Sequence, residues 1–193
     1  MESIAVFCAS GIGRNPAYRE TAYDFGKYLA SKNKRLIFGG SHLGLMGAVA
    51  DGVLARGGEV IGVLPKFMSD KEIAHSNLTE LIMVESMHER KLIMHELSQG
   101  VVALPGGFGT FEELFEMLTW AQLGLHQKPI GILNVQGYYD SLKMMINHML
   151  KEELLKSQYK SLFFFSKNAE ELLKVMEDKF VQGKDKGLAR KLS

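Results

Sequence analysis

The stretch GVVALPGGFGTFEE, residues 100–113, runs from an apolar segment through a glycine-rich turn into a run with helical spacing. Its first part is a short, continuous apolar run, which predicts a strand that is buried on both faces. Glycines permit the sharp turn that follows, and apolar residues then recur three and four positions apart. A strand that leads directly into a helix is the repeating unit of α/β proteins.

The same order of segments repeats along the chain. Apolar runs predict strands at residues 3–10, 35–40, 59–65, 80–86, 101–107 and 129–135, with an edge strand at 161–166. Runs with helical spacing predict helices at 15–33, 44–58, 87–100, 110–124, 138–154 and 168–180. Asn15 before Pro16 predicts an N-cap with proline at the first helical position. The sequence therefore predicts one doubly wound α/β domain at 1–180, with a mainly parallel sheet flanked by helices and a flexible tail at 181–193.

Composition narrows the classes of partner and the compartment. The 193 residues include 23 lysines and arginines against 22 acids, so no broad charged surface for nucleic acid or an anionic membrane is expected. No apolar run approaches the roughly 20 residues that cross a bilayer. The single cysteine, Cys8, has no intrachain disulfide partner, and the N-terminal segment lacks the pattern of a signal peptide. These features predict a protein of the cytoplasm.

Unusual residues gather where predicted strands end, which is where open parallel sheets bind ligands. The four turns are CASGIGRNP (8–16), GGSHLGLMG (39–47), ESMHERK (85–91) and PGGFGTFEE (105–113). The second turn lacks the GxGxxG spacing of a dinucleotide site, and no GKS or GKT follows the glycines. NAD binding and P-loop ATP hydrolysis are therefore disfavoured.

Two interpretations of residues 105–113 are open. The glycines let the backbone approach an anion, while amides at a helix start and the Thr110 hydroxyl donate to its oxygens. Alternatively, Thr110 and Glu113 are three residues apart and form a capping box that needs no ligand.

Arg90 and Lys91 lie near the start of a predicted helix, where each positive charge costs about 0.3–1 kcal/mol against the helix dipole. A ligand anion would compensate them. The alternative for Arg90 is an ion pair with a glutamate on the next helix. Glu113 lies in register with Met117 and Trp120, so it is expected on a packed face, where a carboxylate has a partner or a chemical role.

The other reactive residue types form no convincing cluster. His88 and His95 are seven positions apart, and no HExxH or Cys/His arrangement occurs, so no metal site is predicted. Cys8 has no base nearby in sequence and is interpreted as a buried, inert thiol. Ser10 follows it in the first turn and is placed to contact a ligand.

Taken together, GGSHLGLMG, SMHERK, PGGFGTFEE and TWAQLGLHQKPIGILNVQGYYD resemble the LOG (Lonely Guy) family of cytokinin riboside 5'-monophosphate phosphoribohydrolases, from about Ile4 to Phe180. The motif PGGxGTxxE after MHxRK and GLMG is a specific combination. The resemblance implies a Rossmann-like homodimer that hydrolyses the N-glycosidic bond of cytokinin riboside 5'-monophosphates or AMP and releases the base and ribose 5-phosphate. Some relatives carry the label lysine decarboxylase, a chemistry whose pyridoxal phosphate site has no support in this sequence.

The resemblance also implies the site residues. Arg90 and Glu113 are expected as the catalytic pair, and no metal or cofactor is required. The residues expected to bind the nucleoside 5'-monophosphate and its phosphate are Ser10, Gly40, Met87, Arg90, Lys91, Gly106, Gly107, Phe108, Gly109 and Thr110.

Cleavage of a ribosyl C–N bond develops positive charge on the sugar, so Glu113 is expected to stabilise that charge and to orient or deprotonate water. Arg90 is expected to position the substrate and Glu113. The alternative function is a nonenzymatic carrier of a nucleotide or phosphorylated cofactor, since molybdenum cofactor carrier proteins resemble this family. Apolar residues spread around residues 110–126 indicate at least a dimer.

Overall fold

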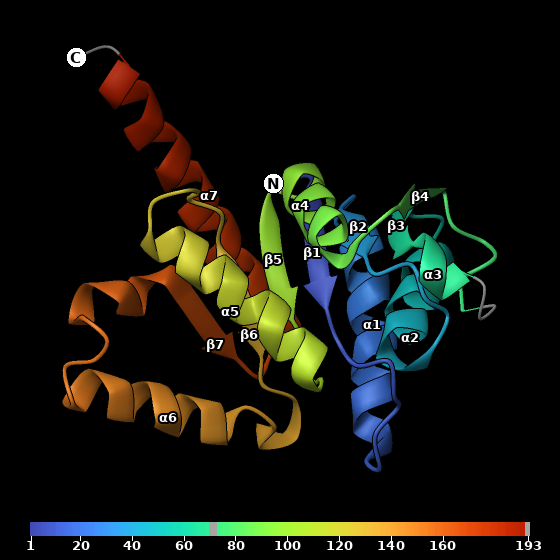
Figure 1. Ribbon diagram of the computed structural model, residues 1–193, viewed down its shortest axis with the longest axis horizontal. Helices are drawn as coiled ribbons and strands as arrows, with labels where there is room; N and C mark the ends of the chain where they lie inside the picture. The colour runs from blue at the N-terminus through green and yellow to red at the C-terminus, as the bar shows by residue number, and fades with distance from the viewer. Residues whose placement is uncertain (70–72, 192–193) are drawn as a thin grey trace.

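The computed structural model describes residues 1–69 and 73–191. Within them, a seven-stranded sheet has the order β4-β3-β2-β1-β5-β6-β7, and its neighbouring strands pair in parallel (Figure 1). The strands are β1 (Ser3–Phe7), β2 (Arg35–Phe38), β3 (Val60–Pro65), β4 (Glu80–Val84), β5 (Gly100–Ala103), β6 (Ile130–Leu133) and β7 (Phe163–Ser166). Each overlaps a predicted segment, so the doubly wound α/β prediction is confirmed.

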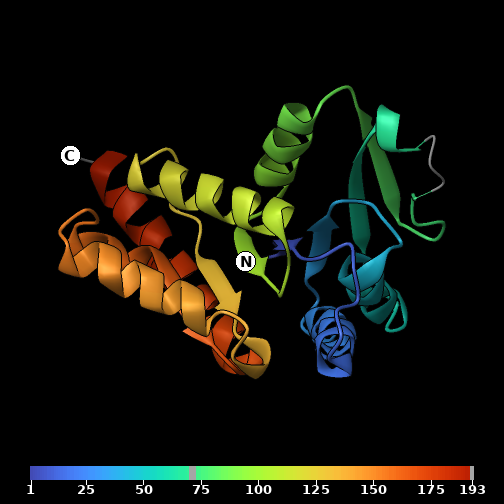
Figure 2. The same cartoon turned by 60° about the horizontal axis from the view of Figure 1, so that its bottom comes forward.

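The helices cover both faces of the sheet. Buried side chains of α1 (Pro16–Ser31), α2 (Gly44–Leu54) and α7 (Ala169–Lys191) form one core with one face. Those of α4 (Met87–Leu97), α5 (Phe108–Gln122) and α6 (Asp140–Lys151) form a second core with the other. Figure 2 shows α4 and α5 on one side of the sheet and α1 and α2 on the other. Because both faces are covered, the strands read as continuous apolar runs.

Local sequence signals set how α1 begins and how closely it packs. The Asn15 side chain accepts a hydrogen bond from the Ala17 amide at 3.0 Å, with Pro16 at the first helical position, as the sequence predicts. Gly26 of α1 faces α2, and Gly52 of α2 faces α1. A Cβ at either position would lie about 2 Å from a backbone atom of the facing helix. Both residues must therefore be glycine for the two helices to pack this closely.

The strand order reverses between β1 and β5, and this reversal positions the site. From β1 the chain builds outward through β2, β3 and β4, and then returns to place β5 on the other side of β1. The loops that follow β1 and β5 are joined by a hydrogen bond from the Ala9 amide to the Pro105 carbonyl, at 3.1 Å. Such a switch point opens a crevice at the carboxyl ends of the two strands.

The structure adds short helices that the sequence pattern does not predict: α3 (Lys66–Ser69), η1 (Val135–Gly137) and η2 (Ser157–Leu162). Helix α7 continues to Lys191 and so includes most of the predicted tail at 181–193, of which residues 192–193 lie outside the described residues. Flexibility of that segment stays a prediction. Among the described helices, none combines the length and the apolar character of a membrane span.

Candidate active site

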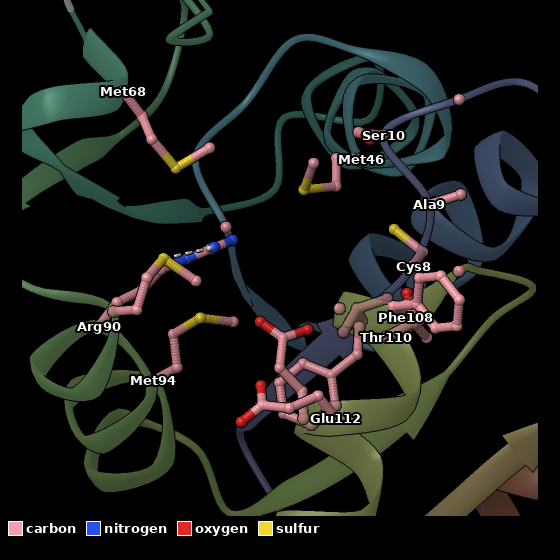
Figure 3. A pocket seen from close by; sticks show the side chains of 18 residues that line it. Cys8, Ala9, Ser10, Met46, Met68, Arg90, Met94, Phe108, Thr110 and Glu112 are labelled. Atoms are coloured by element: carbon pink, nitrogen blue, oxygen red, sulfur yellow. Dashed lines mark hydrogen bonds between the residues drawn. The ribbon is translucent and has the colours of Figure 1, made fainter.

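A cavity of about 390 Å³ lies at the switch point between β1 and β5. Figure 3 shows that its walls come from the loop after β1, from α2, α3 and α4, and from the start of α5. The residues that line it are Val6, Phe7, Cys8, Ala9, Ser10, Gly11, Gly39, Met46, Met68, Met87, Arg90, Met94, Gly107, Phe108, Gly109, Thr110, Glu112 and Glu113.

Helix α5 begins two residues earlier than predicted, and this overturns the capping-box interpretation. Gly107 is the N-cap, it provides no side-chain hydrogen bond, and Thr110 lies inside the first turn. Thr110 therefore cannot cap the helix, because a cap residue precedes the first turn. The residues of this helix start line the cavity, and no side chain caps their amides, which is the arrangement that binds anions.

Two adjacent tyrosines far along the chain hold the glycine-rich turn in place. Tyr138 donates its hydroxyl hydrogen to the Gly106 carbonyl at 2.5 Å, and Tyr139 donates to the Leu104 carbonyl at 2.6 Å. Gly106 has no room for a side chain, since a Cβ there would lie 2.0 Å from Thr110 Oγ1. The shape of the turn is thus fixed by contacts from beyond β6.

Glu113 is a buried carboxylate one turn into α5, with 8% of its surface exposed. Burial raises the pKa of Glu113 to about 7, against the lowering effect of the Arg90 charge. A carboxyl group with this pKa exchanges a proton near neutral pH, as a general base requires. Strongly shifted groups that line a cavity indicate a functional site.

Arg90 is also buried, with 7% of its surface exposed. Its guanidinium lies against Gly39 at the end of β2, where a Cβ would lie 1.7 Å from Nη2. Nη1 contacts the Met87 sulfur at 3.8 Å, and Nε is buried with no hydrogen-bond partner. No ion pair joins Arg90 to a carboxylate within residues 1–69 and 73–191, so the ordinary ion pair with a glutamate on the next helix is not observed.

Lys91 makes the ion pair that was the alternative for Arg90. Its ammonium donates to Glu112 and, at 3.0 Å, to Glu116, both on α5. Burial disfavours the charged form of Lys91, but the hydrogen bonds to the two carboxylates outweigh it and raise its pKa. Lys91 connects α4 to α5 and is not among the described residues that line the cavity.

Most of the predicted site residues meet in the cavity. Those that line it are Ser10, Met87, Arg90, Gly107, Phe108, Gly109, Thr110 and Glu113. Among them, Phe108 is 97% exposed to solvent. Gly40, Gly106 and Lys91 do not line it: Gly40 adopts a φ of +77° and packs against Leu64 and Leu81. The binding and catalytic roles of all the predicted residues stay predictions.

Sequence reasoning missed several lining residues. Gly39 lies beneath Arg90, and the methionines Met46, Met68 and Met94 complete the apolar wall. The consecutive glycines at 39 and 40 were the available signal, but only the fold shows which of the two faces Arg90.

Cys8 also lines the cavity as a buried thiol, and burial, reinforced by the Glu113 carboxylate, raises its pKa. A raised pKa keeps the thiol protonated and unreactive. In the part of the chain that the structure describes, no three His, Cys, Asp or Glu side chains are placed to hold a metal ion.

Comparisons with known proteins identify the family of this chain. Residues 46–176 match the family model described as possible lysine decarboxylase. Cytokinin riboside 5'-monophosphate phosphoribohydrolase LOG1 of Arabidopsis thaliana is 42% identical over 91% of this chain and 82% of its own length. The probable phosphoribohydrolase LOGL9 of Oryza sativa subsp. japonica is 42% identical over 91% of this chain and 77% of its own.

Solved structures share the fold at lower identity. The molybdenum cofactor binding protein of Rippkaea orientalis superposes with a TM-score of 0.67 at 22% identity, covering 92% of this chain and 96% of its own. The Moco carrier protein of Chlamydomonas reinhardtii gives 0.70 at 20% identity, covering 94% and 98%. At these identities the likeness concerns the fold alone. The family model and the relatives above 40% identity show that this chain belongs to the LOG family, the group whose model is described as possible lysine decarboxylase.

Proposed function

We propose that this chain hydrolyses the N-glycosidic bond of adenine-type nucleoside 5'-monophosphates, namely cytokinin riboside 5'-monophosphates, AMP or both. The observation that carries the proposal is that buried Glu113 and the uncapped amides of residues 108–110, three to five residues or about 4.5–7.5 Å earlier along the axis of α5, line the same cavity. That spacing suits a ribose whose 5'-phosphate lies on the amides and whose C1' faces the carboxylate. The named activity of relatives 42% identical supports the same substrate class.

In the proposed reaction, the helix-start amides and the Thr110 hydroxyl hold the phosphate. The bond from C1' to the base nitrogen breaks, its electron pair leaves with the base, and positive charge develops on the sugar. Ionised Glu113 stabilises that charge and accepts a proton from the water whose oxygen bonds to C1'. A proton from solvent completes the free base, and ribose 5-phosphate is the second product.

Arg90 is the second member of the proposed catalytic pair. Its guanidinium lies in the cavity wall and, among the described residues, donates only to the Met87 sulfur, so the Nη2 hydrogens are available to a bound substrate. Packing against Gly39 and Met87 restricts its movement. We assign Arg90 to orient the nucleotide against Glu113, where accurate placement accelerates the reaction.

The chemistry in the description of the family model is not supported by the cavity. A pyridoxal-phosphate decarboxylase needs a lysine that forms a Schiff base with its cofactor. Among the described residues that line the cavity, there is no lysine, and Lys91 is bound by two carboxylates outside it.

The carrier alternative shares the fold, and no further observation favours it. A carrier needs tight, reversible binding and has no use for a carboxylate poised to ionise near neutral pH, such as Glu113. Equilibrium binding of AMP without any product would support the carrier and contradict the hydrolase.

The direct test is to incubate the purified protein with AMP and with an N6-prenylated AMP, and to measure free base and ribose 5-phosphate by chromatography. Release of base in equal amount with ribose 5-phosphate is the expected result. If the folded protein releases no free base from either nucleotide, the proposal is overturned. The ratio of the two kcat/KM values identifies the preferred base.

We further propose that the protein is a cytoplasmic homodimer. Exposed apolar side chains on and after α5 support an interface there: Phe115, Leu123 and Leu125 are 37%, 66% and 67% exposed. Side chains of this kind in one region favour a second protein surface over water. The single cysteine and the near-neutral charge support the compartment and argue against nucleic acid and membranes as partners.

A further inference from the structure

Lys91 lies between the two helices that carry the proposed catalytic pair. It follows Arg90 on α4, and its ammonium binds Glu112 and Glu116 on α5. Glu112 directly precedes Glu113 in the chain. The ion pair between Lys91 and Glu112 therefore joins the chain neighbours of Arg90 and Glu113. This network of Lys91, Glu112 and Glu116 is therefore connected through the backbone to both proposed catalytic residues.

This network differs from an ordinary surface ion pair. The Lys91 side chain is only 12% exposed and the Glu116 side chain is 25% exposed, whereas the Glu112 side chain is 53% exposed. Partly buried charges are screened less by salt than exposed ones, and one ammonium shared by two carboxylates restricts all three side chains. Such a connection holds α4 and α5 in one relative position.

We propose that Lys91 is a positioning residue that ties α4 to α5 through Glu112 and Glu116, and thereby holds Arg90 and Glu113 in register across the cavity. The inference rests on the proposed function, because it assigns Lys91 a role in that same reaction. It differs from the phosphate-binding role expected from the sequence, since the ammonium is held by two carboxylates and is not part of the described cavity wall.

The charges around Glu113 give this network a second consequence. Arg90 and Lys91 on α4 lower the pKa of Glu113, whereas Glu112 and Glu116 on α5 raise it, and the Cys8 thiol faces it from the end of β1. Without Lys91, two carboxylates beside Glu113 lose the cation that neutralises them. Glu113 would then keep its proton to higher pH and would lose the negative charge that the sugar cation needs.

A positioning role and a substrate-binding role predict different kinetics. Loss of a direct phosphate contact that acts equally on bound substrate and transition state raises KM and leaves kcat unchanged. Loss of positioning lowers kcat, because the reacting groups are misplaced after the substrate has bound.

The test compares Lys91→Met, Lys91→Arg and the matched control Lys27→Met, which removes another lysine paired with a carboxylate, Asp24, on the remote helix α1. For Lys91→Met we expect kcat for AMP to fall about tenfold or more with KM within about threefold of the parent. The acidic limb of its pH profile should move up by about one pH unit. Lys91→Arg should recover most of kcat because arginine also bridges two carboxylates, and Lys27→Met should match the parent.

Glu116→Gln tests the same network from its other side. This variant removes one carboxylate beside Glu113 and keeps Lys91, so the acidic limb should move down while kcat falls. A lysine that only binds phosphate predicts no loss of kcat in Glu116→Gln. If circular dichroism and thermal unfolding show that Lys91→Met is not folded, Glu116→Gln still tests the network.

A readout without substrate separates this inference from the proposed function. Titration of the ¹³C-labelled Glu113 carboxyl by NMR should give a higher pKa in Lys91→Met and a lower one in Glu116→Gln. If the parent releases no base from AMP, the proposed function fails while this titration still tests the network. A raised KM with parental kcat in Lys91→Met, or a Glu113 titration that neither substitution moves, would overturn the positioning role.

Discussion

Glu113 is a carboxyl group whose charge is set by its surroundings. In water a glutamate is ionised at neutral pH, but burial in the cavity wall raises the pKa of Glu113 to about 7. At that value the protonated and ionised forms are both well populated near neutral pH. The same side chain therefore influences catalysis and the stability of the fold.

Glu113→Gln keeps the shape of the side chain and removes its negative charge. We expect kcat for nucleoside monophosphate hydrolysis to fall by about 10²-fold or more, because the sugar cation loses its stabilising charge. Turnover and thermal unfolding are measured on the same preparation. A folded variant with close to the parental rate would exclude the proposed mechanism. Arg90→Ala is expected to be similarly impaired while folded.

Part of the pH dependence of stability should come from Glu113. The folded pKa of about 7 exceeds the ordinary value of 4.5, so the folded state holds the proton more tightly than the unfolded state. Its stabilising effect is complete below about pH 4.5 and is lost as pH rises through about 7. We expect the Tm of the parent, relative to Glu113→Gln, to fall across this range. A constant difference in Tm would contradict the raised pKa.

At the scale of elements, the site depends on close contacts between segments distant in sequence. The end of β2 provides the surface on which Arg90 of α4 lies, and the start of α5 provides the open amides. Tyr138 and Tyr139, at the start of the segment that leads into α6, hold the turn between β5 and α5. Each element thus supplies one part of the proposed chemistry.

Gly39→Ala should displace Arg90, since the new Cβ would lie 1.7 Å from the present position of Nη2. We expect kcat/KM to fall in Gly39→Ala, and the double variant with Arg90→Ala to lose no more than Arg90→Ala alone. Kinetics of the two single variants and the double variant form the test. Additive losses would show that Gly39 acts independently of Arg90.

The start of α5 should make the 5'-phosphate obligatory. We expect kcat/KM for AMP to exceed that for adenosine by about 10²-fold or more, because binding energy at the phosphate positions the sugar against Glu113. Thr110→Val removes the hydroxyl and leaves the shape of the side chain nearly unchanged. It should lower the ratio of kcat/KM for AMP to kcat/KM for adenosine. Equal kcat/KM for the two substrates would exclude a phosphate site here.

At the scale of the whole molecule, the reversal of strand order places α4 and α5 at the cavity on one face of the sheet. Apolar side chains at the far end of α5 and beyond it are left exposed. The helices on one face of the sheet thus carry both the proposed catalytic pair and the surface that we assign to association of two copies.

The protein is expected to sediment as a dimer at assay concentrations. Leu123→Asp with Leu125→Asp places charges where two exposed apolar side chains lie directly after α5, and should weaken association. Analytical ultracentrifugation of the parent and this double variant is the measurement. A monomeric parent would contradict the proposed homodimer.

The sequence by itself determined the α/β fold, the position of every described strand and the N-cap at Asn15, because these depend on local apolar runs and short-range hydrogen bonds. It also singled out Arg90 and Glu113 as a candidate pair. Only the tertiary structure decided that Thr110 lies inside α5, that Gly39 supports Arg90, and that Lys91 pairs with two glutamates. These features depend on burial and on contacts between distant segments, which the order of residues along one helix or strand does not encode.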